Sequence, residues 1–174
     1  MTRLLPLIRF FLRQWLPVAA LSSALMLGIA HAFETFGHMA PCHLCLQERQ
    51  VYWVAMTVAA VAFATSLTPL GERIRRPASA LLALIFLFSA GLAAYHAGVE
   101  WHWWPGPETC TPVAGGVSKA NLMALLHGGH TDIVDCSKPA WVFLGLSMAG
   151  WNVLCSLKLA VWSGVAAAWR GPTA

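Results

Sequence analysis

The sequence contains very little charge. Only 10% of its 174 residues are Asp, Glu, Lys or Arg, whereas 58% are hydrophobic, and its mean hydropathy is +0.63. Soluble globular domains usually carry about 25% charged residues, so the composition argues against a soluble domain and predicts a membrane protein. The formal net charge of +4 is too small and too scattered to form a nucleic-acid-binding surface.

Four apolar stretches are each close to the roughly 20 residues needed to cross a bilayer core. They cover residues 15–33, 50–67, 78–98 and 141–161, and the last has an alternative position at 148–169. Backbone polar groups in lipid must be hydrogen-bonded within their own segment, so these stretches should be helices. We therefore predict an all-α membrane protein that forms one domain over residues 1–174, a four-transmembrane-helix bundle with outer loops at 34–49 and 99–140.

The basic residues predict the orientation of this bundle. If the N-terminus lies inside, seven basic residues lie inside and three outside; the inner ones are Arg3, Arg9, Arg13, Arg73, Arg75, Arg76 and Arg170, and the outer ones are Arg49, Lys119 and Lys138. This excess predicts that both termini are inside and the cysteine-bearing loops outside. Lys158 would lie near the inner end of the last span if that helix starts at Trp141, where its ammonium can reach the interface.

The N-terminal segment has a second interpretation. Its arginines, apolar core and the sequence Ala-His-Ala at residues 30–32 resemble a cleavable signal peptide. The apolar run is long, however, and residues 4–12 are themselves largely apolar, which favours a retained first transmembrane helix. Cleavage would leave Cys42 on the outer side in either case.

The five cysteines are distributed unevenly. Cys42 and Cys45 fall in the first outer loop, Cys110 and Cys136 in the second, and Cys155 inside the last apolar stretch. Four cysteines in an oxidising compartment can form disulfides, and three pairings are possible. Proximity favours 42–45 and 110–136. Cys155 is most simply a small buried hydrophobic residue.

Three functions compete for the four outer cysteines: structural disulfides, a metal site and thiol–disulfide exchange. A 42–45 disulfide closes almost no loop and would therefore constrain the unfolded chain very little. The second pair lacks the short spacing of a zinc ribbon, and Leu46 stands where haem attachment at a Cys-x-x-Cys motif requires histidine. We therefore predict no metal and favour thiol–disulfide exchange.

The surroundings of Cys45 strengthen this hypothesis. A second helix that begins at about Leu46 would put Cys45 near a helix N-terminus, whose partial positive charge favours a thiolate. Arg49 follows four residues later, on the same helical face. Both features should lower the pKa of Cys45, while Glu48 opposes them from about 100° around the helix. Alternatively, Arg49 is simply a residue of the membrane boundary.

Four motifs together resemble the DsbB family of bacterial inner-membrane disulfide-forming proteins. They are "PCHLCLQER" before an apolar helix, "YHAGVEWHWWPGPETC", a later "DC" and "FLGLSMAGWN". The resemblance extends from about residue 13 to residue 165. It implies that Cys42, Cys45, Cys110 and Cys136 are the catalytic cysteines, that the membrane is the inner membrane, and that the termini are cytoplasmic and the cysteine loops periplasmic.

The resemblance also implies a mechanism. A reduced DsbA-like thioredoxin-fold protein attacks a Cys110–Cys136 disulfide at Cys110, the freed Cys136 attacks Cys42, and Cys45 passes the electrons to a membrane quinone (ubiquinone or menaquinone) beside Arg49. The partner's couple is strongly oxidising, roughly −120 mV, so thiol chemistry alone can hardly drive its reoxidation. A quinone in the bilayer would supply the driving force.

Two further elements follow from the resemblance and the loop sequence. His96 resembles the quinone-side histidine of the family, although an ungapped count back from Cys110 would assign that position to Ala97. Residues 118–129 put three leucines on one helical face before Gly128–Gly129, and predict a short amphipathic helix on the outer surface. Two other functions stay open: a non-enzymatic membrane subunit with structural disulfides, and a quinone-linked thiol reductase working in the reverse direction.

Overall fold

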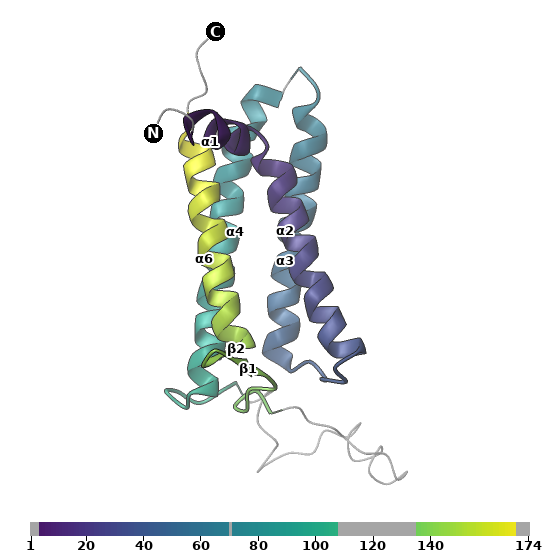
Figure 1. Ribbon diagram of the computed structural model, residues 1–174, viewed down its shortest axis with the longest axis vertical. Helices are drawn as coiled ribbons and strands as arrows, with labels where there is room; N and C mark the ends of the chain where they lie inside the picture. The colour runs from purple at the N-terminus through teal and green to yellow at the C-terminus, as the bar shows by residue number, and fades with distance from the viewer. Residues whose placement is uncertain (1–3, 70, 108–134, 170–174) are drawn as a thin grey trace.

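The computed structural model describes residues 4–69, 71–107 and 135–169. The described elements are α1 (Leu4–Arg13), α2 (Trp15–Thr35), α3 (His43–Ser66), α4 (Gly71–Glu100), β1 (Val142–Phe143), β2 (Leu146–Ser147) and α6 (Met148–Ala168). Helices α2, α3, α4 and α6 run along the length of the molecule, as Figure 1 shows. Helix α1 lies across one end, and the β1–β2 hairpin lies at the other.

Three helices are long and apolar enough to cross a membrane. They are Trp15–Thr35, Arg73–Glu100 and Met148–Ala168. Helix α3 has 24 residues but does not meet the same criterion, and its first two turns carry Glu48 and Arg49. The described part of the chain is thus mostly helical, as predicted, while the fourth span stays a prediction. The predicted surface helix at 118–129 lies outside the described residues.

Small side chains fill the centre of the bundle and large apolar side chains cover its outside. Ala19, Ala55 and Ala59 are fully buried, with Leu82 and Phe86 between them. Small residues let membrane helices approach closely, so that dispersion forces and interhelical hydrogen bonds can act. Leucine, valine and phenylalanine side chains on the same helices are exposed, among them Leu21, Leu84, Phe88 and Val161. This distribution is the one expected in a bilayer.

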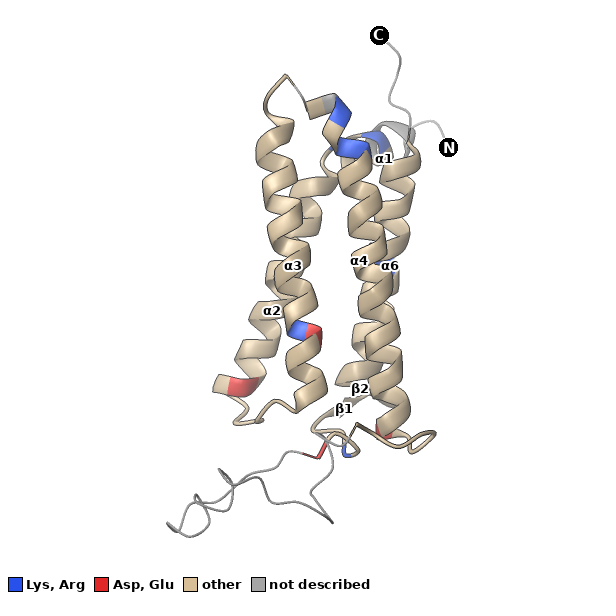
Figure 2. Cartoon of the chain, turned by 180° about the vertical axis from the view of Figure 1, so that it is seen from behind, with Lys and Arg blue, Asp and Glu red and all other residues tan. Residues whose placement is uncertain are grey.

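Helix α1 was not predicted from the sequence, which showed only that residues 4–12 are largely apolar. The helix ends at Arg13, and Phe11 packs edge-to-face against Trp15 and Trp162, with ring centroids 5.4 and 5.1 Å apart. The backbone oxygen of Arg13 accepts a hydrogen bond from Arg75. Basic residues gather at this end of the bundle (Figure 2), as the charge distribution of the sequence suggests.

Helix α6 begins at Met148 and not at Trp141. The preceding residues form a two-stranded antiparallel hairpin in which Val142 pairs with Ser147. Leu144 and Gly145, at its turn, have φ of 52° and 79°, the conformation of a two-residue hairpin loop. Lys158 therefore lies in the middle of the 21-residue helix with an exposed side chain, so the predicted position near the inner end is wrong.

Candidate active site

Cys42 and Cys45 form a close pair at the start of α3. Cys42 is the N-cap residue, and its Sγ accepts a hydrogen bond from the backbone N–H of Cys45 at 3.2 Å. The two sulfur atoms lie 2.7 Å apart and both thiols are free. A disulfide bond measures about 2.05 Å, so a movement of under about 1 Å closes it. The geometry suits a pair that alternates between dithiol and disulfide.

The pKa values of the two thiols are shifted in opposite directions. The hydrogen bond from the Cys45 thiol lowers the pKa of Cys42, with help from the backbone N–H of Cys45. The same hydrogen bond, together with burial, raises the pKa of Cys45. The sequence predicted a thiolate at Cys45 because it expected the helix to begin at about Leu46. The helix begins at His43, so the N-terminal N–H groups favour a thiolate at Cys42 instead.

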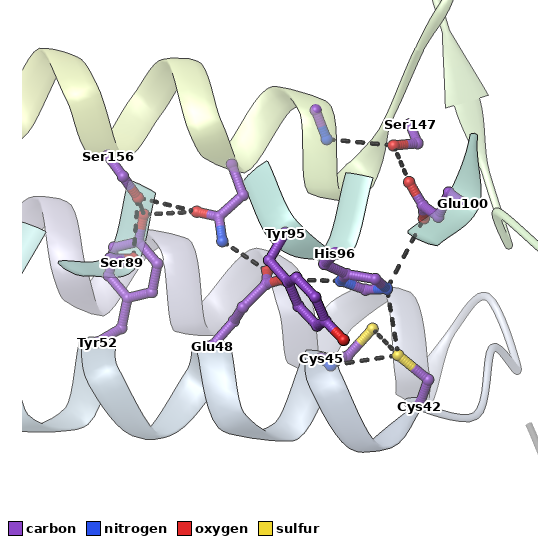
Figure 3. Close-up of polar contacts among 12 residues, drawn as sticks. Cys42, Cys45, Glu48, Tyr52, Ser89, Tyr95, His96, Glu100, Ser147 and Ser156 are labelled. Carbon is purple, nitrogen blue, oxygen red and sulfur yellow. Dashed lines mark hydrogen bonds and ion pairs between the residues drawn. The ribbon is translucent and has the colours of Figure 1, made fainter. Parts of the chain in front are cut away.

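A histidine and a carboxylate extend this pair into the bundle. Nε2 of His96, on α4, lies 3.5 Å from the sulfur of Cys42, and its Nδ1 lies 2.7 Å from Oε1 of Glu48. The amide of Asn152, on α6, donates to Oε2 of Glu48 at 2.6 Å. His96 is 3% exposed and Glu48 8%. Three helices thus hold one buried carboxylate in a fixed orientation (Figure 3).

The polar chain continues toward the middle of the bundle. The hydroxyl of Tyr52 donates to Oδ1 of Asn152 at 2.7 Å and lies 2.9 Å from the hydroxyl of Ser156. Ser89 lies 3.0 Å from Ser156. Every buried side-chain nitrogen and oxygen in the described part of the chain has a hydrogen-bond partner. Such a satisfied network fixes the positions of its members and makes each of them costly to remove.

Arg49 forms its hydrogen bonds with α2 and not with the thiol pair. Its guanidinium binds the carboxylate of Glu34, and it also donates to the backbone oxygen of Ala30 at 3.1 Å; both partners belong to α2. The Arg49 side chain is 14% exposed and that of Glu34 is 40% exposed. Arg49 therefore ties α3 to α2, and the contact with Cys45 that the helical register predicts is replaced by an ion pair between helices.

An apolar pocket of about 300 Å³ opens beside Cys45. Its walls come from α2, α3, α6 and the segment before β1, and include Met26, Phe33, Trp141 and Trp151. A few polar groups face it: the Cys45 thiol, the Glu48 carboxylate and the Arg49 guanidinium among them. Small-molecule sites commonly have this size, with apolar walls and few polar groups. His96 does not line this pocket.

A second, much smaller cavity of about 50 Å³ also lies beside the pair. Cys42 and Cys136 both line it, together with His96 and Glu100. Cys42 and Cys136 also belong to one buried cluster. Cys45 and Glu48 line both the small cavity and the apolar pocket, whereas Cys42 and Cys136 line the small cavity and not the pocket.

The geometry of the pair differs from that of a zinc site. Two thiolates bound to one tetrahedral zinc ion at 2.3 Å lie about 3.8 Å apart, whereas the sulfurs of Cys42 and Cys45 are 2.7 Å apart. The arrangement suits sulfur–sulfur bond formation better than metal coordination. That no metal binds here stays a prediction.

Most of the predicted site residues that the structure describes lie close together. Cys42, Cys45 and His96 are in mutual contact range, and Cys136 lies in the same cluster as Cys42. It is His96, and not Ala97, that reaches the cysteines. Cys136 is in a disulfide; Cys110 lies outside the described residues, so their predicted pairing stays a prediction.

Sequence analysis missed two central members of the site. Glu48 was considered only as a charge opposing a thiolate, and Asn152 was given no role in the site. A signal was present: polar residues recur four apart on otherwise apolar helices, as in Glu48 and Tyr52 or Asn152 and Ser156. Such pairs share a helical face.

The fold has helices suited to cross a membrane, and it holds two thiols close enough to form a disulfide. These two features define the class of membrane proteins with a thiol–disulfide redox pair. The family model of the disulfide bond formation protein DsbB matches residues 12–166. The chain is 31% identical over 152 residues to the disulfide bond formation protein B of Methylococcus capsulatus, covering 80% of this chain and 84% of that protein. The corresponding protein of Aromatoleum aromaticum is 29% identical over 144 residues, covering 79% and 81%. No solved structure matches the chain significantly.

The chain belongs to the DsbB family. The resemblance of its cysteine motifs to this family is therefore confirmed. The family and the three candidate membrane-spanning helices together indicate a multi-pass membrane protein that acts in disulfide bond formation.

Proposed function

We propose that the protein is a quinone-dependent thiol oxidoreductase of the bacterial inner membrane, which reoxidises a DsbA-like periplasmic protein. The observation that carries this proposal is that the two cysteines of the pair have different access to the two spaces. Cys42 lines the small cavity with Cys136 and does not line the apolar pocket, whereas Cys45 lines both. One disulfide can therefore exchange with a protein thiol at Cys42 and deliver electrons to the pocket at Cys45.

The proposed electron path uses four cysteines. A thiolate of the partner attacks a Cys110–Cys136 disulfide at Cys110, which forms a mixed disulfide and frees Cys136. Cys136 then attacks the Cys42 sulfur of the oxidised pair, and Cys45 leaves as a thiol or thiolate. The second thiol of the partner then displaces Cys110, and Cys110 attacks Cys136, which reforms the Cys110–Cys136 disulfide and releases Cys42. The partner departs oxidised, and two electrons and two protons remain on Cys42 and Cys45. Both termini would be cytoplasmic and the cysteines periplasmic.

The apolar pocket fits a quinone head group. Its volume of about 300 Å³ and its aromatic and methionine walls suit a planar ring, and Arg49 can donate to a ring oxygen. A bound quinone would supply a two-electron, two-proton acceptor. Cys45 and Arg49 are the residues proposed to face it. Since His96 lies against Cys42 and outside this pocket, we propose that it acts on the thiol pair and not on the quinone.

Reconstitution tests the proposal directly. Detergent-purified protein is mixed with a reduced DsbA-like protein and excess quinone, and quinone absorbance is followed together with the partner's free thiols. We expect catalytic loss of quinone matched by equal loss of dithiol, and no turnover in Cys45→Ala. Cys136→Ala should accumulate an adduct joined to the partner at Cys110, because the resolving thiol is missing.

Two outcomes would contradict the proposal. An absence of quinone loss with folded protein would favour a non-enzymatic subunit with structural disulfides. Reduction of an oxidised partner by quinol, faster than the forward reaction, would make the protein a reductase.

A further inference from the structure

Oxidation of a buried dithiol requires a path for protons as well as for electrons. Two thiols that become one disulfide release two electrons and two protons, and a quinone that becomes a quinol takes up both. The Cys45 thiol lines the apolar pocket and can lose its proton there. Cys42 does not line the pocket, and its sulfur lies 3.5 Å from Nε2 of His96 beside the small cavity, so its proton needs a carrier.

Glu48 is positioned to be that carrier. Among the described residues it is the one carboxylate that lines both the small cavity and the apolar pocket. Its Oε1 lies 2.7 Å from Nδ1 of His96, and the opposite ring nitrogen lies 3.5 Å from the Cys42 sulfur. The three groups form a continuous line from the sulfur to the pocket (Figure 3).

We propose that Glu48 carries the Cys42 proton from His96 to the acceptor in the apolar pocket, an inference that rests on the proposed quinone-linked function. His96 accepts the proton of Cys42 at Nε2 and gives the proton on Nδ1 to Glu48. Glu48 passes it to the pocket, while the Cys45 thiol supplies the second proton. The sulfurs would then form one disulfide, with both electrons and both protons passed to the acceptor. Glu48 returns to its starting protonation state, and His96 is left neutral as the other tautomer, with its proton on Nε2.

The other titratable groups around Glu48 are less suited to this task. Glu100, on α4, lies 3.9 Å from Nε2 of His96, but its carboxylate is held by Ser147 and does not line the pocket. Asp135 and Lys138 line only the small cavity. On the pocket side, the Tyr52 hydroxyl is engaged by neighbouring polar groups.

The remaining neighbours of Glu48 lie on its own helix, on α2 and on α6. The charge of Arg49 is paired with Glu34 of α2. Cys155, on α6, also lines the pocket. Asn152 is neutral; by donating to Oε2 it leaves Oε1 directed at His96. This fixed orientation is what general acid–base catalysis requires.

A stopped-flow experiment separates proton transfer from thiol exchange. Pre-reduced protein is mixed with quinone, and quinone loss is followed for the wild type, Glu48→Gln and Glu48→Ala. Positioned acid–base groups contribute about 10²- to 10⁴-fold to rate, so Glu48→Gln should slow this step at least about tenfold. Quinone half-saturation and the rate of mixed-disulfide formation with the partner should stay within about twofold. Formate should restore rate to Glu48→Ala, whose cavity can admit it, and not to Glu48→Gln.

Glu100→Gln is the matched control. It removes a buried carboxylate beside the same histidine, yet Glu100 does not face the pocket. We expect formate to have no effect on this variant. A purely structural role of Glu48 would give no formate rescue in Glu48→Ala either, and that result would overturn the proposal.

A second measurement needs no quinone. Infrared difference spectra between the oxidised and the dithiol protein, recorded with isotope-labelled glutamate, should contain carboxylate bands in the wild type and in Glu100→Gln. These bands should disappear in Glu48→Gln. If the labelled wild type lacks these bands, the Glu48 carboxylate does not change with the redox state of the thiol pair and the inference is wrong. This test needs the wild-type protein alone and therefore holds even if Glu48→Gln fails to fold. Failure of wild-type protein to reduce quinone would instead overturn the proposed function.

Discussion

The hydrogen bond between Asn152 and Glu48 should be one of the strongest polar links between helices. It joins α6 to α3 at 2.6 Å and supplies one of the two partners of a carboxylate that is 8% exposed. Hydrogen bonds to charged groups contribute about 1.5–3 kcal/mol in soluble proteins, whereas interhelical hydrogen bonds in membranes average about 0.6 and reach about 1.7 kcal/mol. Since the acceptor is a nearly buried carboxylate, we expect Asn152→Leu to lower the free energy of unfolding by about 2 kcal/mol.

A double-mutant cycle isolates the link from changes in packing. Glu48→Met removes the carboxylate while keeping an apolar side chain of similar length. Replacing both partners of a buried hydrogen bond by apolar groups can be nearly neutral, so the double variant should be less destabilised than the sum of the single variants, by at least about 1 kcal/mol. Tyr52 retains its contact with Ser156 in all variants, which limits secondary effects.

Equilibrium unfolding in mixed detergent micelles, followed by tryptophan fluorescence, measures the four free energies. Uncoupled sites add within about 0.3–0.5 kcal/mol. A coupling energy below about 0.5 kcal/mol would therefore refute the view that Asn152 holds the Glu48 carboxylate in place.

Four residues give further predictions. In the reduced protein Cys42 should be alkylated by iodoacetamide at lower pH than Cys45. The lowered pKa of Cys42 keeps this thiol ionised until the pH falls through that pKa. Peptide mapping that finds Cys45 modified first would contradict this prediction. Arg49→Ala should raise the quinone concentration for half-maximal rate. Arg49→Lys should recover only part of the loss, because an ammonium lacks the planar fork that reaches Glu34 and the backbone together. Identical half-saturation in the wild type and both variants would remove Arg49 from the site. Lys158→Leu should favour membrane insertion by up to about 2.5–3.5 kcal/mol, the cost of lysine at a helix centre, in a glycosylation-reporter assay; no gain would mean that its ammonium reaches the interface. Cys155→Ala should leave turnover within about twofold, since an apolar environment makes a thiol inert; a tenfold loss in folded protein would place this thiol in the relay.

The helices were predictable because apolar runs of about 20 residues have few alternatives to a membrane helix. Their starting points were predicted unevenly: α2 begins at Trp15 as predicted and α6 at the alternative position, residue 148, whereas α3 begins before the expected Leu46. Helix ends depend on single residues that hydropathy ignores. Cys42 acts as an N-cap through its sulfur, a role usually held by Ser, Thr, Asp or Asn. The turn at Leu144 and Gly145 likewise separates Trp141 from the helix that begins at Met148.

The candidate cysteine pair could be proposed from spacing, since a Cys-x-x-Cys pair is local. Their partners could not, because they come from other helices. His96 is 48 residues from Glu48, and Asn152 is 104 residues from it. Arg49 illustrates the same limit. It shares a helical face with Cys45, as its spacing predicts, yet its guanidinium forms an ion pair with the carboxylate of Glu34 on α2. Local periodicity identifies which face a side chain occupies, and only packing decides what that face meets.

The ion pair between Arg49 and Glu34 bears on how the proposed reaction separates thiol exchange at Cys42 from electron transfer at Cys45. A guanidinium left unpaired beside Cys45 would attract the thiolate to the pocket side and would bring water with it. Because Glu34 takes this charge, the strongest stabilisation of a thiolate is at Cys42, where N–H groups of α3 and His96 converge. Negative charge that forms as Cys42 gives its proton to His96 is then held away from the apolar pocket, and Cys45 can meet an apolar acceptor as a neutral thiol. Electron transfer to an acceptor in the pocket would then be coupled to proton movement through Glu48. Neither the electrons nor the protons would have to cross the apolar pocket as an uncompensated charge.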